Sequence, residues 1–449
     1  MVIQSVTSRR WSAASTLLVL LLSALWIAGG ASRPDVMGQI VARSAGWLAL
    51  VSAILCGLRP GIARTGPVAW LLLAAILLVL LQLVPLPPAV WTLLPGREPF
   101  LESALGPAPW RPWSIVPWAT INAASSLIVP AVIFYLASAL SDEERERLPG
   151  LLLGMIFLSA LLGLWQFCGF SFSHPLVNDT EGSVSSIFAN RNHFALFLAM
   201  GCLIAPVWAA SGWQGRRWRV PVALALVALF ALTILATGSR SGILTGLLAI
   251  GMGLMFSWRD IRHAFRHAPP WVVPVLVAAL IGLVALLVLI SIAADRAESV
   301  NRAFALDPGE DMRRRGLPTV LGMIGAYFPA GTGFGSFDPM FRIHEPFVLL
   351  KRTYFNHAHN DFLEILLDGG LLALLLLLAA LGWYIWASLR AWREGPMHYG
   401  LARLGSGMLL LILIASLFDY PARTPIFMSI IVIAAAWLGQ GASPIALRR

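Results

Sequence analysis

Long apolar runs, separated by short polar connections, dominate the chain. Residues 67–87, PVAWLLLAAILLVLLQLVPLP, are a typical run. A helix needs about twenty such residues to cross a hydrocarbon core of ~30 Å. The pattern therefore predicts an all-α integral membrane protein with about twelve transmembrane helices. The expected spans are 12–30, 40–58, 67–86, 119–140, 150–170, 192–211, 220–238, 241–257, 271–293, 361–386, 400–418 and 424–440.

Composition agrees with this class. The 449 residues are 58% hydrophobic and 12% charged, whereas soluble domains carry roughly 25% charged residues. The formal charge of +10 would favour nucleic-acid binding if the basic side chains formed one patch. They are instead divided between alternate connections, so a nucleic-acid partner is not expected.

The division of the arginines predicts the orientation. One set of connections is rich in arginine: Arg9/Arg10, Arg59/Arg64, Arg145/Arg147, Arg216/Arg217/Arg219, Arg259/Arg262/Arg266, Arg390/Arg393 and Arg448/Arg449. The opposite set carries scattered bases: Arg33, Arg43, Arg97, Arg111, Arg191, Arg240 and Arg423. The positive-inside rule makes the first set cytoplasmic. Both termini are then cytoplasmic, and we expect the first span to be kept as an anchor.

Two outer connections are long. In the larger, residues 294–360, the sequence LPTVLGMIGAYF places Leu317, Leu321, Ile324 and Phe328 on one helical face. We expect an amphipathic helix on the outer membrane surface, with Pro318 near its first turn. The following GTGFGSF, residues 331–337, lacks a strand–turn–helix context and predicts a tight backbone reversal.

Ionisable groups at membrane depth are energetically unfavourable and usually functional. The topology places four polar motifs on the outer side. In the first, TGSRSG at 237–242, a tight helical hairpin carries Arg240. The arginine suits an anion site beside a helix start, or a contact with lipid headgroups. Gly242 and Gly246 predict close helix packing.

Two further motifs allow more than one interpretation. In FANRNHFALF, residues 188–197, Asn190, Arg191, Asn192 and His193 either cap the sixth span or line a polar cavity. In DMRRRGLP, residues 311–318, Arg313, Arg314 and Arg315 form a solvated basic face or a second clamp for the anion at Arg240.

The fourth motif is YFNHAHNDFLEILLDGG at 354–370. Asn360, Glu364 and Asp368 are spaced i, i+4 and i+8, on one face of the tenth span. His357 and Asp361 are also four apart, which makes them possible partners. Apolar residues fill the rest of the helix, so the polar stripe faces a water-filled cavity or the bundle interior.

A histidine can accept a proton near neutral pH. A base near arginines points to group transfer on a phosphate-bearing substrate. We expect no metal, because the chain has no i, i+4 histidine pair here.

These motifs resemble the O-antigen ligase and Wzy-type polymerase superfamily. The resemblance rests on IFANRNHFALFLAMG, TGSRSG, PAGTGFGSF and HAHNDFLEILLDGGLLALLLL, in that order along the chain, and covers roughly residues 185–380. It implies a division into N-terminal transmembrane helices at 1–184, a ligase-like core at 185–440 with a periplasmic loop at 294–360, and a cytoplasmic tail at 441–449.

The resemblance implies a metal-independent, inverting glycosyltransferase of the bacterial inner membrane that needs no cofactor. It would move a glycan from undecaprenyl diphosphate to a hydroxyl of lipid A-core or a growing polysaccharide, at the periplasmic face. An exopolysaccharide polymerase and a protein O-oligosaccharyltransferase are alternatives within the superfamily. Ala373, three positions past Gly370, leaves ligase and polymerase both open. A lipid-linked oligosaccharide flippase is the alternative of another class.

The resemblance also assigns roles. His359 matches the catalytic base and Arg240 matches the hairpin arginine that binds the diphosphate. Arg314 matches the loop arginine, with Arg315 as the alternative register. The polar groups expected to support this site are Asn190, Arg191, Asn192, Asn360, Asp361 and Glu364.

Overall fold

The computed structural model describes most of the chain as helix. The described residues are 11–61, 66–101, 109–170, 174–178, 182–210, 218–266, 271, 274–275, 278, 281–282, 308–350, 355–393 and 400–441. The tail at 442–449 and most of the predicted ninth span, 271–293, lie outside them.

The long helices follow the predicted spans. They are α1 (Ala13–Ala28), α2 (Met37–Leu55), α3 (Gly66–Leu81), α5 (Pro117–Ser126), α6 (Ile128–Ala139), α7 (Asp142–Phe167), α8 (Arg191–Ala210), α9 (Arg219–Thr237), α10 (Arg240–Arg266), α15 (Asp361–Arg393), α16 (Gly400–Ala415) and α17 (Pro425–Gly441). Among the described residues, seven helical segments are long and apolar enough to cross a membrane, with α5 and α6 counted as one, and four shorter apolar helices accompany them. Eleven of the twelve predicted spans therefore coincide with helices.

The outer connections contain shorter elements. These are β1 (Pro85–Leu86), α4 (Pro88–Trp91), η2 (Glu98–Phe100), β2 (Arg111–Pro112), α13 (Pro308–Tyr327), α14 (Phe337–His344), η3 (Phe347–Leu349) and η4 (Pro421–Arg423). Strands β1 and β2 pair antiparallel. The expected all-α class is confirmed, since the described residues are mostly helical and the strands are a single two-residue pair that ties the ends of the connection at 87–110 together.

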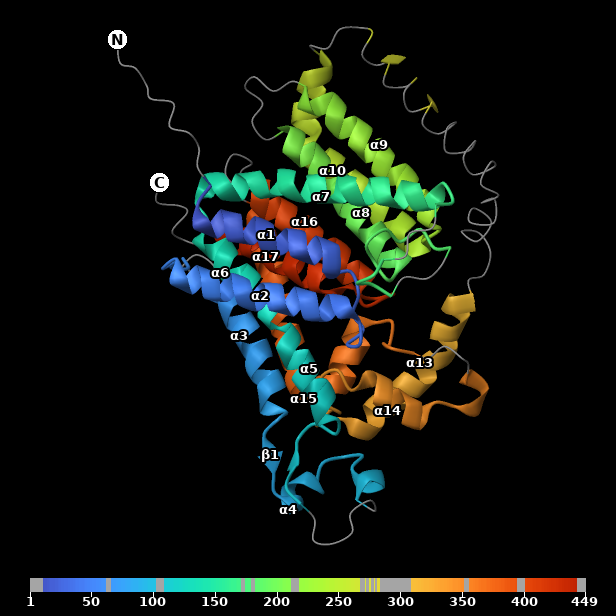
Figure 1. Cartoon of the computed structure of the whole chain (residues 1–449). Coiled ribbons are helices and arrows are strands. Elements are labelled where there is room, and N and C mark those ends of the chain that lie inside the picture. Colours follow the sequence, from blue (N-terminus) through green and yellow to red (C-terminus); the bar gives the residue numbers. More distant parts are fainter. Residues whose placement is uncertain are drawn as a thin grey trace.

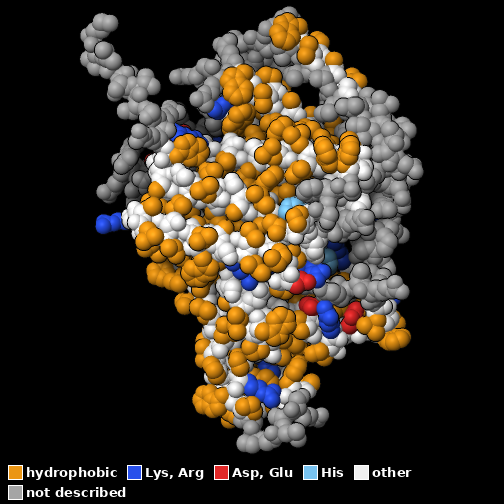
Figure 2. Space-filling model, viewed as in Figure 1, with side chains coloured by type: hydrophobic (Ala, Val, Ile, Leu, Met, Phe, Trp, Pro, Cys, Tyr) orange, Lys and Arg blue, Asp and Glu red, His pale blue; other side chains and the backbone are white. Residues whose placement is uncertain are grey.

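The helices form a bundle around α8, which packs against α7, α9, α10 and α16 (Figure 1). Elsewhere in the bundle, α17 packs against α16, α6 and α1. Hydrophobic side chains cover most of the face in Figure 2, with a group of charged side chains near α14. An apolar exterior around an apolar core is the composition that lipid surroundings require.

The connections meet in two groups, as the arginine pattern predicts. In one group, Ser12 donates its backbone N–H to Glu144, and the Tyr135 hydroxyl donates to Leu58 O. In the other group, Ala189 N–H donates to Gly30 O and Ile426 N–H to Gly29 O. The predicted outer connections therefore gather together, and α13 and α14 lie with them (Figure 1). Which group faces the cytoplasm stays a prediction.

A break in α15 shapes the outer side. Gly370 has φ 58° and ψ −142° inside the helix, a conformation that glycine adopts readily. The backbone N–H groups of Thr332 and Gly333 donate to the freed carbonyls of Leu367 and Asp368. A Cβ on Gly370 would lie 2.1 Å from Pro329 O. The GTGFGSF segment thus makes the predicted reversal, and its backbone satisfies the kink.

Helix α13 is longer than predicted. It begins at Pro308, so Pro318 lies in its middle and not in its first turn. Its buried face carries Val320, Met323 and Tyr327, which pack with α14 in a second apolar cluster. The predicted face, with Leu317 and Leu321, is exposed. An exposed apolar face is what a helix on a membrane surface presents, and this location of α13 stays a prediction.

Candidate active site

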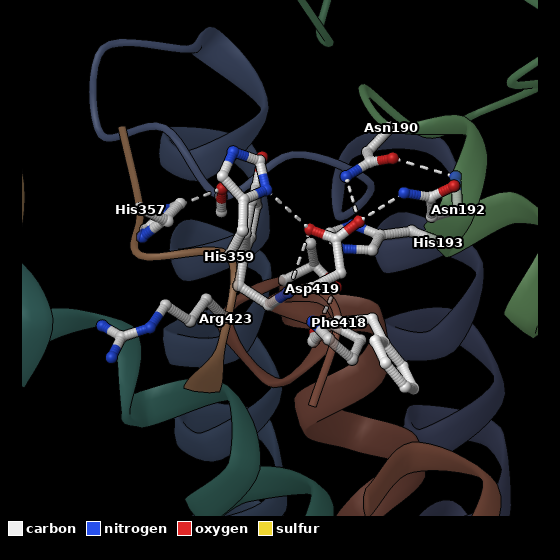
Figure 3. Close-up of polar contacts among 12 residues, drawn as sticks. Asn190, Asn192, His193, His357, His359, Phe418, Asp419 and Arg423 are labelled. Atoms are coloured by element: carbon white, nitrogen blue, oxygen red, sulfur yellow. Dashed lines mark hydrogen bonds and ion pairs between the residues drawn. The ribbon is translucent and has the colours of Figure 1, made fainter. Parts of the chain in front are cut away.

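The outer ends of four segments converge on one carboxylate, Asp419, in the connection between α16 and α17 (Figure 3). Three segments belong to predicted motifs: the start of α8, the first turns of α13, and the turn before α15. The side chain of Asp419 is only 3% exposed. Its contacts are Asn190 Nδ2 (2.8 Å), Asn192 Nδ2 (2.7 Å), His359 Nδ1 (3.2 Å), Tyr420 N (3.1 Å), Arg313 Nη2 (3.7 Å) and His193 Nε2 (4.0 Å).

These contacts keep Asp419 ionised. Burial by itself raises the pKa of the carboxyl, but Arg313 and the hydrogen bond from His359 outweigh it. The pKa of Asp419 is therefore well below its usual range. A carboxylate in this state only accepts hydrogen bonds, so each nitrogen at hydrogen-bond distance must donate to it.

The hairpin arginine motif joins the site through Ser239. Gly238 ends α9 in a left-handed conformation, and α10 begins at Arg240. The Ser239 hydroxyl donates to Asn192 Oδ1 at 2.7 Å and accepts from Gly242 N–H at 3.0 Å. The prediction of a tight hairpin is confirmed. Close packing is confirmed too, because a Cβ on Gly242 would lie 2.3 Å from the Cβ of Ala195.

Asn190 combines the two interpretations that the sequence left open. Its Oδ1 accepts from Asn192 N–H at 2.9 Å, as a helix cap does. Its Nδ2 donates to Asp419 Oδ2 at 2.8 Å. One side chain therefore begins α8 and also orients the carboxylate. The neighbouring Arg191 is half-buried at the same helix start.

His359 is held by one ring nitrogen. Its Nδ1 donates to Asp419 Oδ1 at 3.2 Å, which leaves Nε2 with the lone pair. No described residue forms a hydrogen bond with Nε2, and the side chain is 16% exposed. Burial lowers the pKa of His359, the hydrogen bond to Asp419 opposes the shift, and Arg313 adds to it. The imidazole is thus a neutral, oriented and accessible base at pH 7.

The backbone of His359 is unusual as well. Its φ is 52°, in the left-handed region that residues other than glycine rarely adopt. Such strain persists where surrounding contacts enforce it, and it is frequent at functional sites. Here the next residue supplies the contacts: Asn360 Nδ2 donates to Leu417 O at 3.0 Å, and its Oδ1 accepts from Leu363 N–H at 3.1 Å. Asn360 therefore aims His359 and begins α15.

His357 has a different environment, and its predicted partner is wrong. Its Nδ1 lies 2.8 Å from Glu364 Oε1 and its Nε2 lies 3.0 Å from Ser32 Oγ, so both nitrogens are engaged inside the protein. Asp361 instead accepts from the Ser416 hydroxyl at 2.8 Å. A one-turn spacing made His357 and Asp361 possible partners, but His357 precedes α15 and its ring is not on that helix face.

The polar stripe of α15 faces the bundle interior. Glu364 and Asp368 are fully buried, and Arg423 contacts both. The distances are 3.0 Å from Arg423 Nη1 to Glu364 Oε1, 3.5 Å from Nη1 to Asp368 Oδ2, and 3.5 Å from Nε to Asp361 Oδ1. Burial alone would lower the pKa of Arg423, but the three carboxylates raise it above its ordinary value. We call these four residues the Arg423 cluster.

The arginines of the predicted anion site differ in how far they are buried. Arg313 reaches inward, with Nη1 3.3 Å from Phe418 O, and contacts Asp419. Arg314 and Arg315, to which the resemblance assigns the diphosphate, are exposed on the next positions of α13. Arg240 is exposed at the start of α10, next to Ser239. Positive charge therefore lies at the rim of the site, and Arg313 connects that rim to Asp419.

Sequence reasoning missed Asp419, Tyr420 and Arg423. The Tyr420 ring stands between three imidazoles, with centroids 5.1 Å from His193, 4.3 Å from His357 and 4.9 Å from His359. A signal was available in FDYPAR, which puts an acid and a base between two apolar runs on the predicted outer side. The rule applied to the other four motifs covers this one equally.

Among the described residues, no group of three or more His, Cys, Asp or Glu side chains is arranged to hold a metal ion. The polar contacts of the site join carboxylates to amides, hydroxyls, imidazoles and guanidiniums.

Comparison with known families gives a match over residues 224–378, about a third of the chain, to the family described as O-antigen ligase. The chain carries the domain of the O-antigen ligase superfamily. The resemblance inferred from the motifs is thereby confirmed, and members of this family are glycosyltransferase-like enzymes. No curated protein sequence matches the chain significantly.

The matched stretch contains part of the site. The O-antigen ligase domain includes Arg240, the three arginines of α13, His359 and the carboxylates of α15. Asn190, Asn192, Asp419 and Arg423 lie outside it. His359 therefore lies inside the matched stretch, whereas Asp419 and the two asparagines that donate to it lie on either side of that stretch.

Proposed function

We propose that the protein transfers a glycan from undecaprenyl diphosphate to an acceptor hydroxyl, on lipid A-core or a growing polysaccharide. The pairing of His359 Nδ1 with Asp419 carries the proposal, because it leaves Nε2 as a base at the rim of a basic site. The O-antigen ligase domain supports the same reaction class.

In the proposed reaction His359 Nε2 accepts the proton of the acceptor hydroxyl. The hydroxyl oxygen forms a bond with the anomeric carbon as the bond from that carbon to the diphosphate oxygen breaks. One in-line displacement inverts the configuration at this carbon. Asp419 stays ionised and stabilises the imidazolium that forms, as the acidic member of a histidine-containing triad does.

The leaving diphosphate gains negative charge in the transition state. Exposed Arg240, Arg314 and Arg315 can donate paired hydrogen bonds to it, and such charge-assisted bonds are the stronger kind. Arg313 is committed to Phe418 O and Asp419, so we assign it to the architecture of the site and leave the diphosphate to its neighbours.

The setting follows from the predicted topology. We propose a bacterial inner-membrane protein with cytoplasmic termini, about twelve spans, and the site at the periplasmic face, where the periplasmic loop at 294–360 meets the connection that carries Asp419. The division into 1–184, 185–440 and 441–449 stays a prediction. Labelling of single cysteines at Ser32 and Asn360 by an impermeant maleimide in intact spheroplasts tests the orientation. Protection of both positions contradicts it.

A reconstituted assay tests the reaction. Wild-type protein in nanodiscs receives polyprenyl-diphosphate-linked glycan and lipid A-core, and the coupled product is followed by mass. Arg240→Ala should raise the KM for the donor about 10- to 100-fold, the loss of one charged hydrogen bond. We expect metal-independent turnover, so activity that EDTA removes and a divalent ion restores would overturn that part.

The phenotype of a deletion strain distinguishes between the alternative acceptors. Long lipid-linked polymer beside unmodified lipid A-core indicates a ligase, and single repeat units on the core indicate a polymerase. Lost exopolysaccharide with unchanged lipopolysaccharide indicates the exopolysaccharide alternative, and a lost protein glycan indicates the protein-modifying one. Donor that crosses the bilayer of proteoliposomes without being consumed supports the flippase.

A further inference from the structure

Two chain segments carry the pair of His359 and Asp419, and several contacts between residues 361–368 and residues 416–423 hold these segments together. Asp361 N–H donates to Ser416 O at 3.0 Å, and Asp361 Oδ2 accepts from Ala422 N–H at 3.2 Å. Beyond these bonds, Arg423 contributes the charged contact between the segments. It lies four residues after Asp419, and its partners on α15 begin two residues after His359.

The arrangement spreads one guanidinium over three carboxylates that belong to a single helix. Asp361, Glu364 and Asp368 occupy successive turns of α15, whereas Arg423 lies in η4. Its planar fork contacts all three at once, which a point charge cannot do. The guanidinium therefore sets both the distance and the register between η4 and α15.

The hydrogen bond at stake has little tolerance. His359 Nδ1 and Asp419 Oδ1 are 3.2 Å apart, at the long end of the hydrogen-bond range. A shift of a few tenths of an ångström between η4 and α15 would separate them. We propose that Arg423 is a positioning residue: through its contacts with α15 it keeps Asp419 within hydrogen-bond reach of His359. The inference rests on the proposed function for its turnover readout alone.

The protonation of His359 reports this geometry without turnover. Asp419 raises the pKa of His359 through the hydrogen bond that Arg423 is proposed to maintain. Loss of that bond lowers the pKa of His359, whereas mere loss of the positive charge of Arg423 would raise it. The ionisable groups that face His359 from the surrounding segments are Asp419, Arg313, His193, His357 and Tyr420.

The experiment compares Arg423→Lys, which retains the charge and loses the fork, with wild-type protein in nanodiscs. The rate of His359 modification by diethyl pyrocarbonate is measured against pH by peptide mass spectrometry, since the reagent attacks the neutral ring. We expect the titration to move to lower pH, kcat to fall about 100-fold as misplaced catalytic groups do, and KM to stay constant. Arg342→Lys, at an exposed position of α14, is the matched control and should leave all three unchanged.

Asp361→Asn is a second test in case Arg423→Lys does not fold. It weakens one contact of Arg423 and keeps an oxygen for Ser416, so a smaller shift in the same direction is expected. Titrations of Arg423→Lys and Asp361→Asn that superimpose on the wild-type curve overturn the inference, whatever their activity. A shift to higher pH overturns it too, because it indicates a direct charge effect. Wild-type protein without transferase activity would refute the proposed function and leave the titration result standing.

Discussion

Two charged clusters lie side by side at the outer end of the bundle, and their charges are arranged in opposite ways. Around Asp419, one carboxylate receives donors from several segments. In the Arg423 cluster, one guanidinium serves three carboxylates. The carboxylates of both clusters are almost fully buried, so protein groups and not solvent stabilise their charge.

The difference explains which residues remain available for chemistry. Surplus donors hold Asp419 ionised, so His359 is oriented through Nδ1 and keeps Nε2 for a substrate. The Arg423 cluster has more acceptors than donors, and Glu364 also contacts His357. The His357 ring is engaged at both nitrogens. Two histidines two residues apart thus have different environments: Asp419 engages only one nitrogen of His359, whereas both nitrogens of His357 are engaged.

Replacement of His359 should have the largest effect. His359→Gln removes the base, and general-base catalysis is worth about 10²–10⁴ in rate. We expect kcat to fall about 10³-fold in the nanodisc assay with an unchanged thermal unfolding temperature. His357→Gln is the matched variant and should lower the unfolding temperature while kcat falls less than about 10-fold. Equal losses of kcat would erase the distinction between the two clusters.

Asp419→Asn should come next. The amide has the shape of the carboxylate but cannot stabilise an imidazolium, and its nitrogen can turn His359 into the wrong tautomer. We expect kcat to fall on the order of 10²-fold with KM within about twofold, measured by initial rates at saturating donor. A rise in KM with constant kcat would instead place Asp419 in substrate binding.

The pH dependence should show a smaller effect. The base must be neutral, and the pKa of His359 lies below its ordinary value of about 6.5. The rate should therefore be constant above about pH 6.5 and decline only as the pH falls through the lowered pKa. Asp419→Asn should move this limb to still lower pH, since the contact that raises the pKa is gone. An acid limb above about pH 7 in the wild-type profile of kcat would contradict the assignment.

The smallest effect is expected at a surplus carboxylate. Asp368→Asn leaves Glu364 and Asp361 on the guanidinium and retains an oxygen that accepts from Gly335 N–H. Like charges this close disfavour one another, so removal of one should change the free energy of unfolding by less than about 1 kcal/mol. Urea unfolding monitored in detergent measures it. A loss as large as that of Glu364→Gln would show that the three carboxylates are not in surplus.

Much of the architecture was predictable because lipid allows few solutions. Twenty apolar residues in a row specify a spanning helix, and the arginines divide the connections into two groups. Local rules failed where tertiary contacts intervened. The break at Gly370 depends on contacts with the segment at 331–335. Helix α13 continues through Pro318, and its apolar contacts with α14 stabilise it.

The site was predictable in its ingredients and less so in its pairings. Helical spacing placed Glu364 and Asp368 on one face and turned it away from lipid, which is observed. It could not supply their partner, since Arg423 is about sixty residues away in the sequence. It paired His357 with Asp361 because one-turn spacing ignores where the helix begins.

The sequence by itself determined the membrane class, the helix pattern, the gathering of polar motifs at one end and the superfamily, all of which follow from local composition and short motifs. The tertiary structure alone decided which charge meets which. Asp419 is the centre of the cluster because residues from three other segments reach it, and His359 keeps Nε2 available because its other nitrogen donates to Asp419. Electrostatic and hydrogen-bond partners depend on distance in the folded structure, and the separation of buried charges along the sequence does not give that distance.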